Sequence, residues 1–341
     1  MATLLPERPP GCAGTVAYAF LTRSTLPLWP AWKRYFDGCP AGSFTVLVHT
    51  QRAGATLRDL MTVGGGEVVA DQVVHGNLRF SYNMIDAMLR LYAGVHARGA
   101  APNGCVPAWV HLSSDVCAPV RDCRTVHADL RRSAGRSFVQ HYQNDGEWKT
   151  SQWMTLWAEH AFALARDRAA LRAQWSGNET DGVGWVRIGA SSHAGALDEF
   201  VWPKALSSRG LPMHLRGLTY VDWGPYAELF RESREAESDP RGRVAPPPQA
   251  EALLREAAGA AAEAASARAG ASVLAMEQHD YPVTFATASA AAEAVAAARA
   301  AGKSFARKFA PSSEVLAVLK NATRRYSTGR PLRRDTYRVV Q

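Results

Sequence analysis

Two apolar runs of strand length, with a helical segment between them, are the sequence feature that most constrains the fold. The runs cover residues 15–22 and 43–49, and the segment 26–36 between them places Trp29, Trp32 and Phe36 at helical spacing. Both runs are apolar along almost their whole length, as is typical of strands buried on both faces of a parallel sheet. The pattern therefore predicts a strand–helix–strand unit with parallel strands.

Later segments extend this unit in the same style. Residues 68–74 read as a third strand, 82–96 as a helix, and 108–113 as a fourth strand that ends in the polar turn Ser113-Ser114-Asp115. Ligands of open α/β sheets bind at the carboxyl ends of such strands. Further along, residues 153–170 and 198–206 read as helices, and 183–195 as short strands and loops. We predict an α/β protein, with a mostly parallel sheet flanked by helices in a single large domain.

The positive charge of the chain is concentrated at its end. The formal net charge is +8, and residues 321–341 carry six arginines against one aspartate. This basic tail is interpreted either as a solvated segment or as a contact for an anionic partner such as a membrane surface. The charge alone would suggest nucleic-acid binding, but its location in the tail argues against that, and no nucleic-acid partner is predicted.

Several common functional motifs are missing from the sequence. It has no phosphate-binding glycine loop, no HExxH or GxSxG motif, and no Asp-x-Asp after an apolar strand that would hold a divalent metal. The five cysteines follow no CxxC spacing, and their odd number leaves at least one thiol free. No signal peptide and no membrane-spanning apolar run is predicted. Without a metal motif, a phosphate site would need cations from the protein itself.

Six segments, taken in order, resemble one enzyme family. They are 17–23 (AYAFLTR), 112–119 (LSSDVCAP), 149–153 (KTSQW), 197–203 (LDEFVWP), 218–223 (LTYVDW) and 305–311 (FARKFAP). Together they resemble the core-2/I-branching β-1,6-N-acetylglucosaminyltransferases, glycosyltransferase family 14, and most of all its plant-type branch. The resemblance spans about residues 15–320. It implies a GT-A-like fold, a UDP-sugar donor, inversion at the anomeric carbon and no metal or other cofactor.

The resemblance assigns the central chemistry to two residues. Glu199 matches the family's general base, which takes the proton of the acceptor hydroxyl as its oxygen attacks the anomeric carbon. Lys308 matches the lysine on the donor diphosphate, and its neighbour Arg307 can assist it. The alternatives are that Asp198 and Glu199 are only helix-start acids, and that Arg307 and Lys308 are only surface cations.

One expected cation is missing from the pattern. Animal members of the family use an upstream arginine, and its position falls near Thr287, where this chain has no arginine. Arg299 or Lys303 is expected to replace it. The departure also leaves room for a member that binds glycan or nucleotide without turnover, which is the alternative to an active transferase.

The remaining site residues follow from the resemblance as well. On the acceptor side Trp223 is expected to stack on a sugar, with Lys149 and Trp153 nearby. On the nucleotide side the expected contacts are Arg23, His49 and Asp115. Trp223 can equally be a core residue and His49 a satisfied strand-end histidine. Cys117 is expected to be a small buried residue near the nucleotide.

These expectations give a division of the chain and a setting. The segments are 1–14 as a disordered N-terminus, 15–230 as the GT-A-like core, 231–275 as a flexible loop with an Ala-rich insertion, 276–320 as the C-terminal part of the catalytic domain, and 321–341 as the basic tail. The expected partners are a UDP-sugar and a glycan or glycoprotein acceptor. The resemblance implies association with Golgi membranes.

Overall fold

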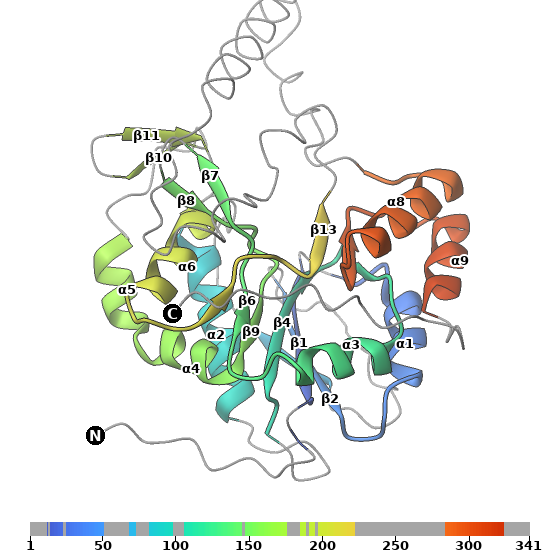
Figure 1. Ribbon diagram of the computed structural model, residues 1–341, viewed down its shortest axis with the longest axis horizontal. Helices are drawn as coiled ribbons and strands as arrows, with labels where there is room; N and C mark the ends of the chain where they lie inside the picture. The colour runs from blue at the N-terminus through green and yellow to red at the C-terminus, as the bar shows by residue number, and fades with distance from the viewer. Residues whose placement is uncertain are drawn as a thin grey trace, which may run out of the picture.

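The computed structural model describes residues 12, 14–22, 25–50, 68–72, 82–97, 106–144, 147–175, 185–188, 191–194, 197–221 and 284–323. Within these ranges, seven strands form the main sheet, in the order β12-β6-β9-β4-β1-β2-β3. The strands are β1 (Val16–Thr22), β2 (Phe44–Thr50), β3 (Val68–Gln72), β4 (Trp109–Ser114), β6 (Ser137–Phe138), β9 (Thr155–Trp157) and β12 (Met213–His214). The predicted α/β class with a mostly parallel sheet flanked by helices is confirmed (Figure 1).

The parallel pairing runs through β1. This strand lies between β2 and β4 and is parallel to both, and β3 is parallel to β2. β9 is antiparallel to both β4 and β6, and β12 is parallel to β6. The predicted strand–helix–strand unit is therefore present, with α1 (Trp29–Asp37) connecting β1 to β2.

Alternate residues of β1 belong to two separate cores, one on each face of the sheet. Val16, Tyr18 and Phe20 pack on one face under α1, α3 (Cys123–Arg131), α8 (Ala288–Ala300) and α9 (Ser313–Ala322). Ala17 and Ala19 face the other way, under α2 (Tyr82–Ala97), α4 (Ala158–Arg166), α5 (Arg168–Trp175) and α6 (Leu197–Ser207) (Figure 1). Burial on both faces explains why the run is apolar instead of alternating.

The helix predicted over residues 153–170 is wrong in its first part. Thr155–Trp157 form strand β9, and α4 begins only at Ala158, whose amide donates to the carbonyl of Ala108 at 2.9 Å. A three-residue strand is too short to show a period, and its pairing with β4 comes from a segment far away in the sequence. By contrast, β10 (Trp185–Ile188), β11 (Ser191–Ala194) and α6 confirm the short strands and the helix predicted after residue 183.

Two small sheets and a hairpin complete the described structure. β13 (Thr219–Val221), β14 (Phe305–Arg307) and β5 (Ala118–Pro119) form a three-stranded sheet in the order β13-β14-β5. β7 (Tyr142–Asn144) and β8 (Glu147–Lys149) form an antiparallel pair, as do β10 and β11. Of the predicted N-terminus only Cys12 and Gly14 are described, and Cys12 is buried; the 231–275 insertion and all of the basic tail beyond Thr323 lie outside the described residues.

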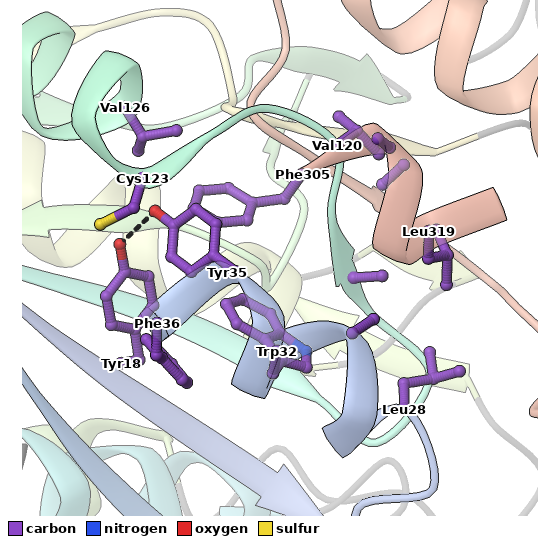
Figure 2. Packing of buried hydrophobic residues seen from close by; sticks show 14 of the residues in the cluster. Tyr18, Leu28, Trp32, Tyr35, Phe36, Val120, Cys123, Val126, Phe305 and Leu319 are labelled. Carbon is purple, nitrogen blue, oxygen red and sulfur yellow. Dashed lines mark hydrogen bonds between the residues drawn. The ribbon is translucent and has the colours of Figure 1, made fainter. Parts of the chain in front are cut away.

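An aromatic cluster joins the three-stranded sheet to the main one. Trp32 of α1 stacks on Phe305 of β14 with ring centroids 5.8 Å apart, and it meets Phe20 of β1 edge-on at 4.9 Å. The indole Nε1 of Trp32 donates to the carbonyl of Cys117 at 2.8 Å. Figure 2 shows Trp32, Phe305 and Tyr35 packed together in this core. The C-terminal strand β14 is thus fixed against the N-terminal unit.

A disulfide and a buried hydroxyl pair reinforce the same region. Cys39, after α1, is bonded to Cys123, the first residue of α3. Beside this bond the hydroxyl of Tyr18 lies 2.5 Å from that of Tyr35 and 3.0 Å from Nε2 of His127 (Figure 2). Burial raises the pKa of both tyrosines, so both hydroxyls stay protonated and serve as hydrogen-bond donors.

The geometry of this network predicts that removing the hydroxyl of Tyr18 lowers the stability of the fold more than removing the hydroxyl of Tyr35. Tyr18→Phe removes the hydroxyl contacts of both Tyr35 and His127, leaving His127 only the weak contact with the sulfur of Cys123 at 3.3 Å, and should lower the free energy of unfolding by about 2–3 kcal/mol. Tyr35→Phe leaves the Tyr18–His127 contact intact and should cost about 1 kcal/mol. Urea denaturation of the two variants measures the difference. Equal losses would contradict the arrangement.

Candidate active site

The carboxyl ends of the central parallel strands form one edge of the sheet, and polar residues gather there. Leu21 of β1 lies in register with His49 of β2 on one side and with Ser114 of β4 on the other. His49 and Ser114 therefore stand about 10 Å apart, two strand spacings. By strand alternation both side chains point to the face covered by α2 and α6, because Leu47 and Leu112 belong to that core. His49 is buried, and Asp115 is half-buried in the turn after β4.

The turn after β4 is held tightly by its neighbours. The amide of Cys117 donates to the carbonyl of Ser114 at 3.2 Å, and the amide of Phe309 donates to that of Val116 at 3.1 Å. Cys117 is buried and is the free cysteine among the described residues, with its sulfur 3.2 Å from the hydroxyl of Ser114. The predicted small buried residue is confirmed. These contacts place Asp115 beside the segment that follows β14.

The predicted base and a predicted acceptor-side lysine form an ion pair. Nζ of Lys149 lies 2.9 Å from Oε2 of Glu199, with side-chain exposures of only 8% and 14%. The amide of Thr150 donates to the carbonyl of Glu199 at 2.8 Å, so the end of β8 is tied to the first turn of α6. The ion pair and this backbone bond together fix the side chain of Glu199 where β8 meets α6.

Arg307 joins this pair from the end of β14. Its guanidinium lies over the ring of Trp153, 4.5 Å from the ring centroid. Burial lowers the pKa of Arg307, and the charges of Cys117, Glu199, Asp115 and Asp198 oppose that shift. Arg307 is therefore a half-buried cation near several acids, with its guanidinium over an indole ring.

From the sequence, Asp198 is expected only as a helix-start acid, with no role in the site. Its side chain is 1% exposed, at the first turn of α6, next to Glu199. Burial raises its pKa to about 7, the charge of Glu199 adds to the shift, and Lys149 and Arg307 oppose it. The available signal was the pair of acids directly before the apolar residues Phe200 and Trp202, which is unusual for a solvated helix start.

The remaining predicted residues divide into those that the structure places and those outside the described ranges. Lys308 follows Arg307 directly and is half-buried, and its carbonyl accepts from the amide of Phe285 at 2.8 Å. Arg23 and Trp223 lie outside the described residues. Glu199, Lys149, Trp153, Arg307 and Asp115 thus come together in one cluster, with His49 on the same sheet edge and Lys308 adjacent in the chain.

The two cations expected to replace the missing arginine have structural contacts instead. Arg299 donates to the carbonyl of Val120 at 2.7 Å and to that of Ala322, and Nζ of Lys303 donates to the carbonyl of Gly217 at 2.9 Å. Thr287, at the position of the missing arginine, caps α8 by accepting from the amide of Ala290 at 3.2 Å. Both cations hold backbone segments in place, whereas Arg307 lies among the acids.

One group within the described ranges has metal-ligand spacing, namely Cys39, Cys123 and His127. The two sulfurs of this group are joined in a disulfide, so it does not offer thiolate ligands. Cys12 is also disulfide-bonded. In the described part of the chain, no helix combines the length and the apolar character needed to cross a bilayer.

Fold and cluster together define an α/β protein with buried acids and cations at the carboxyl edge of a parallel sheet. Residues 16–172 match the family model Branch, the Core-2/I-Branching enzymes. The match covers slightly less than half of the chain. It contains His49, Asp115, Lys149 and Trp153, and ends before Glu199 and Arg307. The chain is therefore similar to this family over its N-terminal part, and membership of the plant-type branch remains a prediction.

Two further comparisons add little. No curated protein matches the sequence significantly. The crystal structure of Rv0371c from Mycobacterium tuberculosis H37Rv is 15% identical, over 48% of this chain and 84% of that chain, with a TM-score of 0.26. A likeness this weak carries no argument about function.

The raised pKa of Asp198 predicts a pH-dependent cost of the buried acid. In the unfolded chain Asp198 loses its proton near its ordinary pKa, whereas in the folded protein it does so at about 7. Stability from this group is therefore full at low pH and is lost as the pH rises toward 7. Asp198→Asn should raise the free energy of unfolding by about 1–3 kcal/mol at pH 8 and by about a third as much at pH 5. Urea denaturation at both pH values measures this, and an equal effect at both would contradict it.

Proposed function

We propose that this chain is an inverting glycosyltransferase, with Glu199 as the general base and with Arg307 and Lys308 on the leaving diphosphate. It would transfer a sugar, N-acetylglucosamine or glucuronic acid, from UDP to a glycan hydroxyl. The observation that carries the proposal is the cluster itself, in which Glu199 and Arg307 interact although they come from distant parts of the sequence. The family match over residues 16–172 supports the same reaction class.

The ion pair suits Glu199 to the role of base. Lys149 contacts Oε2, and a carboxylate has a second oxygen that can accept a proton from an acceptor hydroxyl. As the acceptor oxygen forms its bond to the anomeric carbon, its proton passes to Glu199. The bond from that carbon to the diphosphate breaks on the opposite face. The proton then leaves Glu199 for solvent, and UDP carries away the electron pair of the broken bond.

The leaving diphosphate gains negative charge, and fixed cations can stabilise it. Arg307 offers a planar fork of donors that suits two phosphate oxygens, and Trp153 beneath it limits the orientations of the guanidinium. A cation that is already in place needs little reorganisation during the reaction. Lys308, next in the chain, would add a second charge. The proposal includes activity without a metal ion, to be measured in the presence of a chelator.

The contacts of Lys149 and Trp153 suggest a refinement of their roles. Both residues contact members of the cluster: Lys149 forms an ion pair with Glu199, and the ring of Trp153 lies under the guanidinium of Arg307. They would therefore position the base and the phosphate cation more than bind the acceptor directly. His49 and Asp115 would contact the nucleotide from the sheet edge, and Trp223 and Arg23 keep their proposed roles in acceptor and nucleotide binding.

The disulfides bear on the setting in which the protein works. Cys39–Cys123 and the disulfide of Cys12 would persist in an oxidising compartment such as the secretory pathway. This agrees with the Golgi setting that the family resemblance implies. A membrane-surface contact through the basic tail belongs to the same proposal.

The role of Glu199 is tested by replacing its carboxylate with an amide. Glu199→Gln should lower the rate of UDP release with acceptor by about a hundredfold or more, because the variant cannot take the proton. Its affinity for UDP should change by less than about threefold, since the base faces the acceptor. Glu314→Gln, at the start of α9, is the matched control and should keep full activity.

The assay combines UDP-N-acetylglucosamine or UDP-glucuronic acid with a panel of glycan acceptors in chelator. Full activity of Glu199→Gln would rule out the assigned base. UDP binding without any turnover by the wild-type chain would favour the alternative, a binding protein on the same fold.

The role of Arg307 is tested by UDP affinity. Arg307→Met should weaken UDP binding by about tenfold or more, the usual effect of losing charged hydrogen bonds to a phosphate. Arg209→Met, which removes the ion pair between Arg209, just after α6, and Asp167, between α4 and α5, is the control and should bind UDP normally. Calorimetry measures both. If Arg307→Met binds like wild type, the diphosphate site lies elsewhere.

A further inference from the structure

Asp198, next to Glu199 on α6, is one of several buried polar side chains from α2 and α6 that make no hydrogen bonds with one another. They are the hydroxyl of Tyr92, the indole Nε1 of Trp202 and the carboxylate of Asp198, and none has a hydrogen-bond partner among the other described residues. Trp202 lies one turn after Asp198 on α6, and its ring is 5.9 Å from that of Tyr92. An ionised carboxylate is costly in such a place, whereas a protonated one is not.

The charges that act on Asp198 come from three elements. Glu199 on α6 repels its negative charge, while Lys149 at the end of β8 and Arg307 at the end of β14 attract it. On α2, the charge of Asp198 adds to the rise in the pKa of Tyr92 that burial causes. α4 also packs against α6, and no described residue of α4 is among the charges that shift Asp198. Asp115 joins the group through its interaction with Arg307.

This balance depends on Arg307, the residue proposed to bind the diphosphate. In the unliganded protein the positive charge of Arg307 limits the rise in the pKa of Asp198. A diphosphate at Arg307 would engage that positive charge and add negative charge nearby. Both effects favour the neutral form of Asp198.

We propose that Asp198 is a positioning residue that takes up one proton from solvent when the diphosphate of a nucleotide sugar binds, and returns it when the diphosphate leaves. The inference rests on the proposed function and extends it. With Asp198 neutral, Glu199 no longer stands beside a like charge and keeps its ion pair with Lys149. The two adjacent acids then have different roles, because Asp198 holds a proton while Glu199 accepts one from the acceptor hydroxyl.

The pKa of Asp198 determines how the affinity for the nucleotide sugar changes with pH. Its pKa is about 7 in the unliganded protein, and the bound diphosphate raises this pKa further. Binding therefore takes up a proton in the range between the two pKa values. The affinity is constant at low pH and falls above about pH 7, by at most tenfold per pH unit.

The experiment is calorimetric titration of the full chain with UDP-N-acetylglucosamine, without acceptor, and with UDP-glucuronic acid as a second donor. The phosphates of these nucleotide sugars carry no proton that titrates near neutrality, unlike those of free UDP. Titration at about pH 8 in two buffers of different ionisation enthalpy gives the number of protons taken up. We expect wild type to take up a substantial fraction of one proton, and its affinity to fall about three- to fivefold between pH 7 and pH 8.

Three variants separate Asp198 from the other groups that titrate in this range. Asp198→Asn should bind with no proton uptake and with an affinity that changes less than twofold over the same pH range. His49→Asn should keep the uptake. Glu199→Gln should keep it as well, shifted to lower pH, since Glu199 helps to hold the proton on Asp198. If Asp198→Asn fails to fold, the shift of the uptake to lower pH in Glu199→Gln supports the inference, and an unshifted uptake in that variant overturns it.

Each outcome has a distinct meaning. Uptake that persists in Asp198→Asn, that disappears in His49→Asn, or that is absent from Glu199→Gln at every pH between 5 and 8 overturns this inference and leaves the proposed transferase standing. Binding by wild type with no proton uptake does the same. If wild type binds neither nucleotide sugar, the proposed function fails and this inference fails with it.

Discussion

The pairing of β1 with β2 and β4, parallel on both sides, is the constraint on which the rest of the structure depends. A strand in that position is buried on both faces, so each face requires its own layer of helices. The alternate residues of β1 supply both cores, with Tyr18 and Phe20 on one face and Ala17 and Ala19 on the other. The same pairing brings three strand ends to one edge. A site can form there because polar side chains follow strands that are themselves fixed.

The C-terminal part of the chain completes that site by packing alone. β14 pairs with β5 and β13, and Phe305 stacks on Trp32 in the aromatic cluster of Figure 2. The next residues of β14 are thereby fixed in space, and Arg307 reaches Trp153 and the acids of α6. Dispersion and burial in the core thus set the position of a charge. A cation on a loop would need to lose more freedom to bind a diphosphate.

The buried charges of the cluster have little value as a source of stability. Desolvation of an ion pair such as Lys149–Glu199 consumes most of its Coulombic gain, and a buried carboxylate such as Asp198 is unfavourable at neutral pH. An apolar set of the same volume would make a more stable protein. Groups that are unfavourable for folding but grouped in one place are a common mark of functional sites, where stability is exchanged for chemistry.

The sequence by itself determined the local parts of this account. Apolar runs and helical spacing indicated β1, α1, β2, α2 and β4, and the Asp198-Glu199 pair marked the start of α6, because these signals lie within one element. The tertiary structure alone decided which groups meet. Strand β9 inside a predicted helix, the Cys39–Cys123 disulfide, and the contacts of Glu199 with Lys149 and of Arg307 with Trp153 all join segments far apart in the chain. The raised pKa of Asp198 belongs to the same class, since its burial and the proximity of Lys149 and Arg307 exist only after the chain has folded.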